Sequence, residues 1–141
     1  PSVEMEALGV VSSIIAVLQL TTAVVNYLAS VKSSSKDQKQ CATEATNLLV
    51  LLTRLKFRVE EASSSDPWFI SVRALDVDNG PLSQYKAATE RLVSHITHKG
   101  KAGKIGAALS WPLNKAEVAD ILASIERLKS FISLALELDH L

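Results

Sequence analysis

The chain has 141 residues, with 15 basic and 15 acidic side chains and a formal net charge of +0. A neutral chain has no net field that would attract nucleic acid, so a nucleic-acid partner is not expected. Gly and Pro number only 5 and 4, while Ala, Leu, Ser, Glu and Lys are frequent. This composition favours helix over sheet, and the length is enough to bury the core of one domain.

We expect residues 1–4 to be a vector-derived remnant or a disordered start, with Met5 as the natural first residue. Residues 5–141 are then a single domain. The only cysteine, Cys41, cannot form an intramolecular disulfide, which fits a reducing, cytoplasmic setting.

The first predicted helix, Glu6 to Val31, is the most informative segment because the 25 residues from Ala7 to Val31 carry no charge. Such a helix is about 37 Å long, and the hydrocarbon core of a bilayer is about 30 Å thick. The segment is therefore long enough to cross a membrane and also to be the central helix of a soluble bundle. The side chains expected to meet lipid in an inserted state are Ala7, Leu8, Val11, Ile14, Ile15, Leu18, Val24, Val25, Leu28 and Val31.

One face of the same helix carries only small or polar residues. Its positions step by three or four residues and so lie in one row: Ser12, Ala16, Gln19, Ala23, Asn26 and Ser30. In one interpretation this polar stripe allows close packing inside a bundle, which small residues permit. In the other, several copies assemble in a membrane, and the stripe lines a shared lumen or binds neighbouring copies. Packing alone explains Gln19 and Asn26 poorly, because a buried amide needs partners.

A second helix is predicted from Asp37 to Ala62, with Arg58 off its apolar seam and solvated. Asp66 and Pro67 then have the order of an N-cap and a first helical residue. They open a short helix that Asn79-Gly80-Pro81 ends. The expected seam of the second helix is Cys41, Ala45, Leu48, Leu52, Leu55 and Val59.

A further helix is predicted from after Pro81 to about His98, followed by a loop to Ser110. The last helix opens with Asn114 and Glu117 at capping-box spacing. The fold class is thus all-α, a helical bundle of four long helices plus one short helix. The expected core faces are Leu82, Tyr85, Thr89, Leu92 and Ile96 in the fourth helix, and Val118, Ile121, Ile125, Leu128, Ile132 and Ala135 in the last.

No catalytic, cofactor-binding or metal site is predicted, so the chain is not expected to be an enzyme. His95, His98 and His140 are not paired with other ligands at metal-binding spacing. The segment from Gly100 to Lys104 lacks the spacing of a phosphate-binding loop. Basic residues near the apolar run and in the late loop are either solvated or in contact with anionic lipid head groups: Lys32, Lys36, Lys39, Lys99, Lys101 and Lys104.

Three segments together resemble the fungal HeLo-like N-terminal domain. They are the opening MEALGVVSSIIA of residues 5–16, the turn rich in Ser and Lys after the first helix, and WPLNKAEV of residues 111–118, followed by IERLKSFISLAL of residues 125–136. The resemblance covers about residues 5 to 138, and its third segment is the most specific.

This resemblance implies a helical bundle that executes regulated cell death in fungal non-self recognition. Such domains stand at the N-terminus of NOD-like receptors and amyloid-signalling proteins, and are similar to the four-helix domain of animal necroptosis pseudokinases. By resemblance, activation oligomerises the domain and moves it from the cytoplasm to the anionic lipids of the plasma membrane. The helix of residues 7–31 then permeabilises that membrane. An NTPase or amyloid-motif module is the implied partner in the full-length protein.

An alternative function is a protein-interaction or autoinhibitory module of such a receptor that never enters lipid. In both cases we expect the resting first helix to be covered by the seams of the second, fourth and last helices.

Overall fold

The computed structural model describes the backbone of residues 2–31, 35–63, 65–102 and 111–139, and their side chains except in residues 2–7 and 98–102. The regular elements among these residues are all helical, so the predicted all-α class is confirmed. They are α1 (Ser2–Ser30), α2 (Lys36–Glu61), α3 (Trp68–Arg73), the 3-10 turn η1 (Ala74–Asp76), α4 (Pro81–Ala102) and α6 (Lys115–Leu138).

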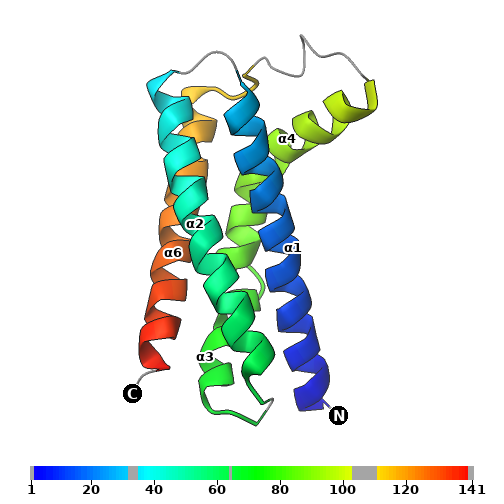
Figure 1. Ribbon diagram of the computed structural model, residues 1–141, viewed down its shortest axis with the longest axis vertical. Helices are drawn as coiled ribbons and strands as arrows, with labels where there is room; N and C mark the ends of the chain where they lie inside the picture. Colours follow the sequence, from blue (N-terminus) through cyan, green and yellow to red (C-terminus); the bar gives the residue numbers. More distant parts are fainter. Residues whose placement is uncertain (1, 32–34, 64, 103–110, 140–141) are drawn as a thin grey trace.

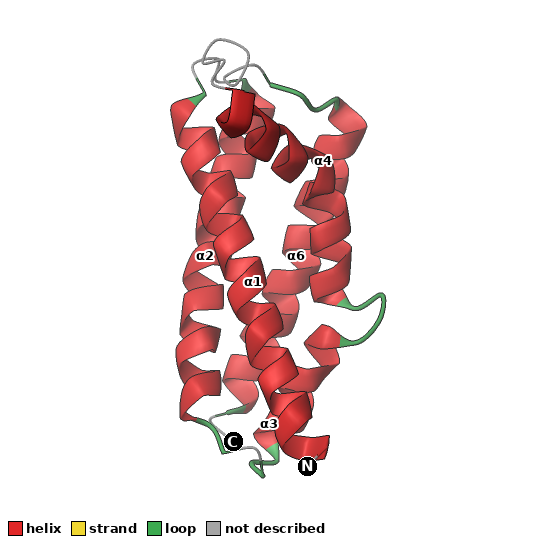
Figure 2. Ribbon diagram, turned by 90° about the vertical axis from the view of Figure 1, so that its right-hand side faces the viewer, coloured by secondary structure: helices red, strands yellow, loops and turns green. Residues whose placement is uncertain are grey.

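The four long helices stand side by side, and α3 closes the end at which α1 begins (Figure 1). α1 and α4 run in one direction, and α2 and α6 run in the other. α1 packs between α2 and α4, which in turn flank α6 on the far side (Figure 2). The last helix is therefore not a direct neighbour of α1, and its seam faces α1 across the shared core. Because the chain crosses the bundle through α3 between α2 and α4, α6 lies diagonally opposite α1.

The core is built from the predicted helical seams. All six predicted seam residues of α2 and all six of α6 are buried. In α4 the predicted face is buried from Leu82 to Leu92, and Ile96 is half-buried. Spacing alone identified these positions because a helix that buries one stripe repeats its apolar residues every three or four positions.

Local side-chain chemistry sets several helix ends. Ser35 caps α2 by accepting the Gln38 backbone N–H at 3.2 Å. Asn114 and Glu117 form the predicted capping box at the start of α6. Asn79 adopts a positive φ of 60°, and a Cβ at the following Gly80 would lie 2.8 Å from the Val77 carbonyl oxygen. The chain therefore turns there as predicted, and α4 begins at once.

Some helix boundaries differ from the prediction. α1 begins at Ser2 rather than Glu6, and α4 continues to Ala102 rather than ending near His98. One glycine, Gly100, costs a helix about 1 kcal/mol and does not by itself end it. The remainder of the predicted loop, residues 103–110, lies outside the described residues. α3 begins at Trp68, one residue later than predicted, although the Asp66 carboxylate still accepts the Trp68 backbone N–H at 3.0 Å.

The seam of α2 predicts a large difference between two neighbouring apolar positions. Leu52→Ala should lower the free energy of unfolding by about 2–5 kcal/mol, because it leaves a cavity at a fully buried site. Val50→Ala, at a side chain that is 56% exposed, should change it by less than about 0.5 kcal/mol. Urea unfolding followed by circular dichroism measures both, and equal losses would contradict the assigned seam.

The capping box predicts a specific response to acid. The Arg91 guanidinium and the Asn114 backbone N–H hold the pKa of Glu117 below its ordinary value of 4.5. A carboxylate with a lowered pKa stabilises the fold fully above its unfolded pKa, and this stabilisation is lost as the pH falls through the folded pKa. The stability advantage of wild type over Glu117→Gln should therefore shrink between pH 6 and pH 3. Urea midpoints measure this advantage, and one that stays constant with pH would contradict the assignment.

Candidate membrane-inserting helix

α1 packs into the bundle along a single row of side chains. Val10, Ile14, Val17, Thr21, Val24 and Tyr27 are buried. The first five step along the helix by four, three, four and three residues, which keeps them on one face. Of the nine side chains that are predicted to meet lipid and that the structure describes, only Ile14 and Val24 belong to this packed face.

Most of the other predicted lipid-facing side chains lie on the flanks of α1. Val11, Leu18, Val25, Leu28 and Val31 are half-buried against the core. Ile15 is half-buried, Leu8 is 67% exposed, and the side chain of Ala7 lies outside the described residues. The helix is thus apolar well beyond the face that the bundle covers.

The predicted polar stripe forms the solvent face of α1. Ser12, Ala16, Gln19, Asn26 and Ser30 are exposed, and Ala23 is half-buried. Close packing inside the bundle is therefore the wrong interpretation of this stripe. Gln19 and Asn26 project into water, which satisfies their amides without a protein partner. The result is a solvent face without a charged side chain.

A buried hydrogen bond joins α1 to α4. The Thr21 hydroxyl donates to the Val17 carbonyl oxygen at 2.8 Å and lies 2.9 Å from the Tyr85 hydroxyl. Since a threonine hydroxyl has one proton, Tyr85 is the donor in the bond between the helices. Burial raises the pKa of Tyr85 to about 12, so its phenol stays protonated near neutral pH. The sequence interpretation missed Thr21, although a hydroxyl in a row of valines and isoleucines was the available signal.

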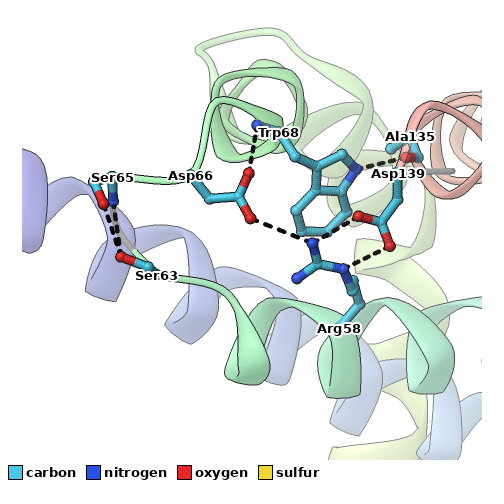
Figure 3. Close-up of polar contacts among 7 residues, drawn as sticks. All are labelled: Arg58, Ser63, Ser65, Asp66, Trp68, Ala135 and Asp139. Carbon is cyan, nitrogen blue, oxygen red and sulfur yellow. Dashed lines mark hydrogen bonds and ion pairs between the residues drawn. The ribbon is translucent and has the colours of Figure 1, made fainter. Parts of the chain in front are cut away.

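A second polar cluster lies at the end of the bundle where α1 begins (Figure 3). The Arg58 guanidinium of α2 donates two hydrogen bonds of 2.6 Å to the Asp139 carboxylate, just after α6. It donates a third, of 3.3 Å, to Asp66 before α3, and it stacks 4.3 Å from the Trp68 ring. The Trp68 indole N–H donates to the Ala135 carbonyl oxygen at 2.6 Å. We call this cluster the Arg58 clasp.

The Arg58 clasp corrects the prediction that Arg58 is solvated. Its side chain is 23% exposed, and hydrogen bonding to Asp139 raises its pKa, so it remains charged. Helical periodicity placed Arg58 off the seam, but it could not show that α3 and the end of α6 meet there. The clasp binds α2, α3 and α6 together.

The predicted head-group lysines are described only in part. Lys36 and Lys39 are exposed in the first turn of α2, directly after the α1–α2 turn. Lys99 and Lys101 lie in the last turns of α4, but their side chains, together with Lys32 and Lys104, lie outside the described residues.

Two further kinds of group bear on chemistry, the single cysteine and possible metal ligands. Cys41 is buried on the seam of α2, and burial together with the Asp37 charge raises its thiol pKa to about 11. Within the residues that the structure describes, no three His, Cys, Asp or Glu side chains gather to hold a metal ion.

Comparison with family models, curated proteins and solved structures finds no match to this chain.

The Arg58 clasp predicts a measurable contribution to stability. Asp139→Asn should lower the free energy of unfolding by about 1.5–3 kcal/mol, since it weakens hydrogen bonds to a charged guanidinium that is mostly buried. The control is Glu60→Gln, which removes the more exposed 3.2 Å Lys56–Glu60 ion pair and should cost less than about 0.5 kcal/mol. Equal effects in urea unfolding would mean that the clasp is no stronger than a surface pair.

Proposed function

We propose that this chain is a non-enzymatic cell-death effector domain of the HeLo-like type, a bundle of four long helices and one short helix. On activation it oligomerises at the plasma membrane and inserts α1. One observation carries the proposal: Leu8–Ser30 is long and apolar enough to cross a membrane by length and composition, and the part of it that the bundle leaves exposed carries no charged side chain. α2 and α6 also bury only one stripe each, but their exposed faces carry charged side chains, as expected for helices of a soluble bundle.

The energetics support an exchange of environments for α1. Each Val or Ile of the packed face contributes about 1.5–3 kcal/mol when it is removed from water. Lipid removes the same side chains from water, and it also covers Leu8 and the half-buried flanks, which the bundle leaves partly wet. Oligomerisation biases the choice between two hydrophobic environments.

The uncharged solvent face of α1 supports assembly of several copies. An exposed helix face normally carries charges, whereas this one carries only the polar stripe and other uncharged residues. In a membrane the polar stripe would face neighbouring copies or a water-filled lumen, and the apolar flanks would face lipid.

Basic residues after α1 support an orientation for insertion. Lys36 and Lys39, with Lys32, would stay on the cytoplasmic side and contact anionic head groups, each contributing about 1 kcal/mol. Lys99, Lys101 and Lys104 are the proposed second group of head-group contacts. Glu4 and Glu6 would have to cross the membrane, which protonation or an oligomeric lumen would ease. An NTPase or amyloid-motif module would supply the trigger in the full-length protein.

A groove between α1 and α3 favours the alternative function, an interaction module that never enters lipid. It has a volume of about 550 Å³, and Gly9, Val10 and Ala74 are among its lining residues. Ile70 and Val77 at this groove are 63% and 52% exposed. Arg73 and Asp76 also line the groove, so the ligand that it would accept is an amphipathic helix of a partner protein with charged residues beside its apolar face.

Dye release from anionic vesicles distinguishes the two functions. Wild-type protein should release dye, and Leu18→Glu/Val25→Glu should release at least tenfold less, because charges on the lipid-facing flank oppose insertion by about 2.5–3.5 kcal/mol each. The matched control, Gln19→Glu/Asn26→Asp, adds the same charge to the polar stripe and should retain most of the release. Because Leu18 and Val25 are half-buried, Leu8→Glu provides a second test at an exposed site.

The membrane function fails if oligomeric wild-type protein leaves vesicles intact while circular dichroism shows that it is folded. It also fails if Leu18→Glu/Val25→Glu and Leu8→Glu both release dye as wild type does. Either result would favour the interaction module.

A further inference from the structure

Thr21 is the fully buried polar residue in the middle of the packed face of α1. Both its side chain and that of Tyr85 are 0% exposed, and their hydroxyl oxygens lie 2.9 Å apart. Thr21 stands between Val17 and Val24 along the row. The bond between the helices is therefore shielded from water.

The two hydroxyls respond differently when α1 leaves the bundle. Thr21 keeps its 2.8 Å bond to the Val17 carbonyl oxygen, so the departing helix carries no unpaired donor into lipid. Tyr85 remains with α4 and loses its acceptor. The aliphatic side chains of the same face find an equivalent environment in lipid, but lipid chains offer nothing to the Tyr85 hydroxyl.

We propose that the Tyr85–Thr21 hydrogen bond is a conformational lock that retains α1 in the resting bundle and fixes its position against α4. Its regulatory meaning depends on the proposed function, because only a helix that is released needs to be retained. An environment shifts such an equilibrium only through interactions that differ between the two states. This bond differs, as does the edge contact of Tyr27 with His95 of α4, whereas the burial of valine and isoleucine does not.

The bond also specifies the position of α1. A rotation of one residue, about 100°, would replace Thr21 on the packed face by Leu20 or Thr22. The Thr22 hydroxyl is exposed and donates to the Leu18 carbonyl oxygen at 2.9 Å. Thr22 thus makes the same bond within the helix as Thr21 but faces away from Tyr85, which makes it the natural control.

Hydrogen exchange of the full chain in water tests the lock without any membrane. Tyr85→Phe removes only the donor hydroxyl, and should speed exchange of the central α1 amides about fivefold relative to those of α6, as expected for one buried hydrogen bond. Thr22→Val should leave this ratio unchanged. Thr89→Val should also leave it unchanged, because the buried Thr89 hydroxyl bonds only to carbonyl oxygens of α4, those of Tyr85 and Lys86.

A double-mutant cycle provides a second measurement. Thr21→Val leaves the Tyr85 hydroxyl without its acceptor. It should speed hydrogen exchange of the α1 amides at least as much as Tyr85→Phe does. The double variant should exceed neither single variant, because both changes remove one shared bond. Additive effects, uniform acceleration in every helix, or no acceleration would each overturn the lock.

Vesicle release then separates the lock from the function that it would regulate. If the proposed lock and the proposed membrane function are both correct, the Tyr85→Phe variant should release dye about fivefold faster than wild type. The Thr22→Val variant should release it at the wild-type rate. If Tyr85→Phe speeds hydrogen exchange selectively in α1 but no variant releases dye, the result would support the lock and reject the membrane function. Release at the wild-type rate by Tyr85→Phe, with wild type active, would overturn the lock as the control of insertion.

Discussion

The structure depends on how α1 is packed: one row of side chains lies inside, and two flanks and a face are left partly or wholly in water. From Leu8 to Ser30 the helix has no charged side chain, so that segment joins its neighbours by burial, by the Thr21 bond and by the edge contact of Tyr27 with the His95 ring of α4. Its two long neighbours, α2 and α4, offer apolar seams, and α3 contacts its first half. Since hydrophobic burial has no preferred direction or partner, α1 is held mainly by an interaction that lipid can also supply.

The other helices are joined differently. The Arg58 clasp ties α2 and α3 to the end of α6, and Lys129 of α6 pairs with Glu44 of α2 at 2.8 Å. Between α6 and α4, Arg127 donates to Gln84 at 2.7 Å. These directional contacts fix the relative positions of α2, α3, α4 and α6 independently of α1. The molecule therefore combines a cross-linked scaffold with one helix that is attached along a single apolar row.

The sequence predicted what depends on local periodicity and left undetermined what depends on how helices meet. The α2 seam from Cys41 to Val59 and the capping box at Asn114 follow from spacing within one helix, and both were predicted correctly. The neighbours α2 and α4 of α1 were expected, but the diagonal position of α6 was not, because the crossing through α3 is a property of the whole chain. Arg58 and Thr21 were missed for a related reason, since their partners Asp139 and Tyr85 lie far away in sequence. The insertion of α1 stays a prediction.

A releasable helix must satisfy two requirements that a permanent core helix does not. It must carry no buried polar group that needs the protein in order to be paired, and it must still be recognised by the protein at rest. Thr21 meets both, because its proton is used within α1 while its oxygen accepts from Tyr85. A charged residue in this position would hold α1 more strongly, but it would also bar entry into lipid. A valine would enter lipid as readily, but it would remove the buried hydrogen bond to α4 and leave the edge contact of Tyr27 with His95 as the specific contact of this row with α4.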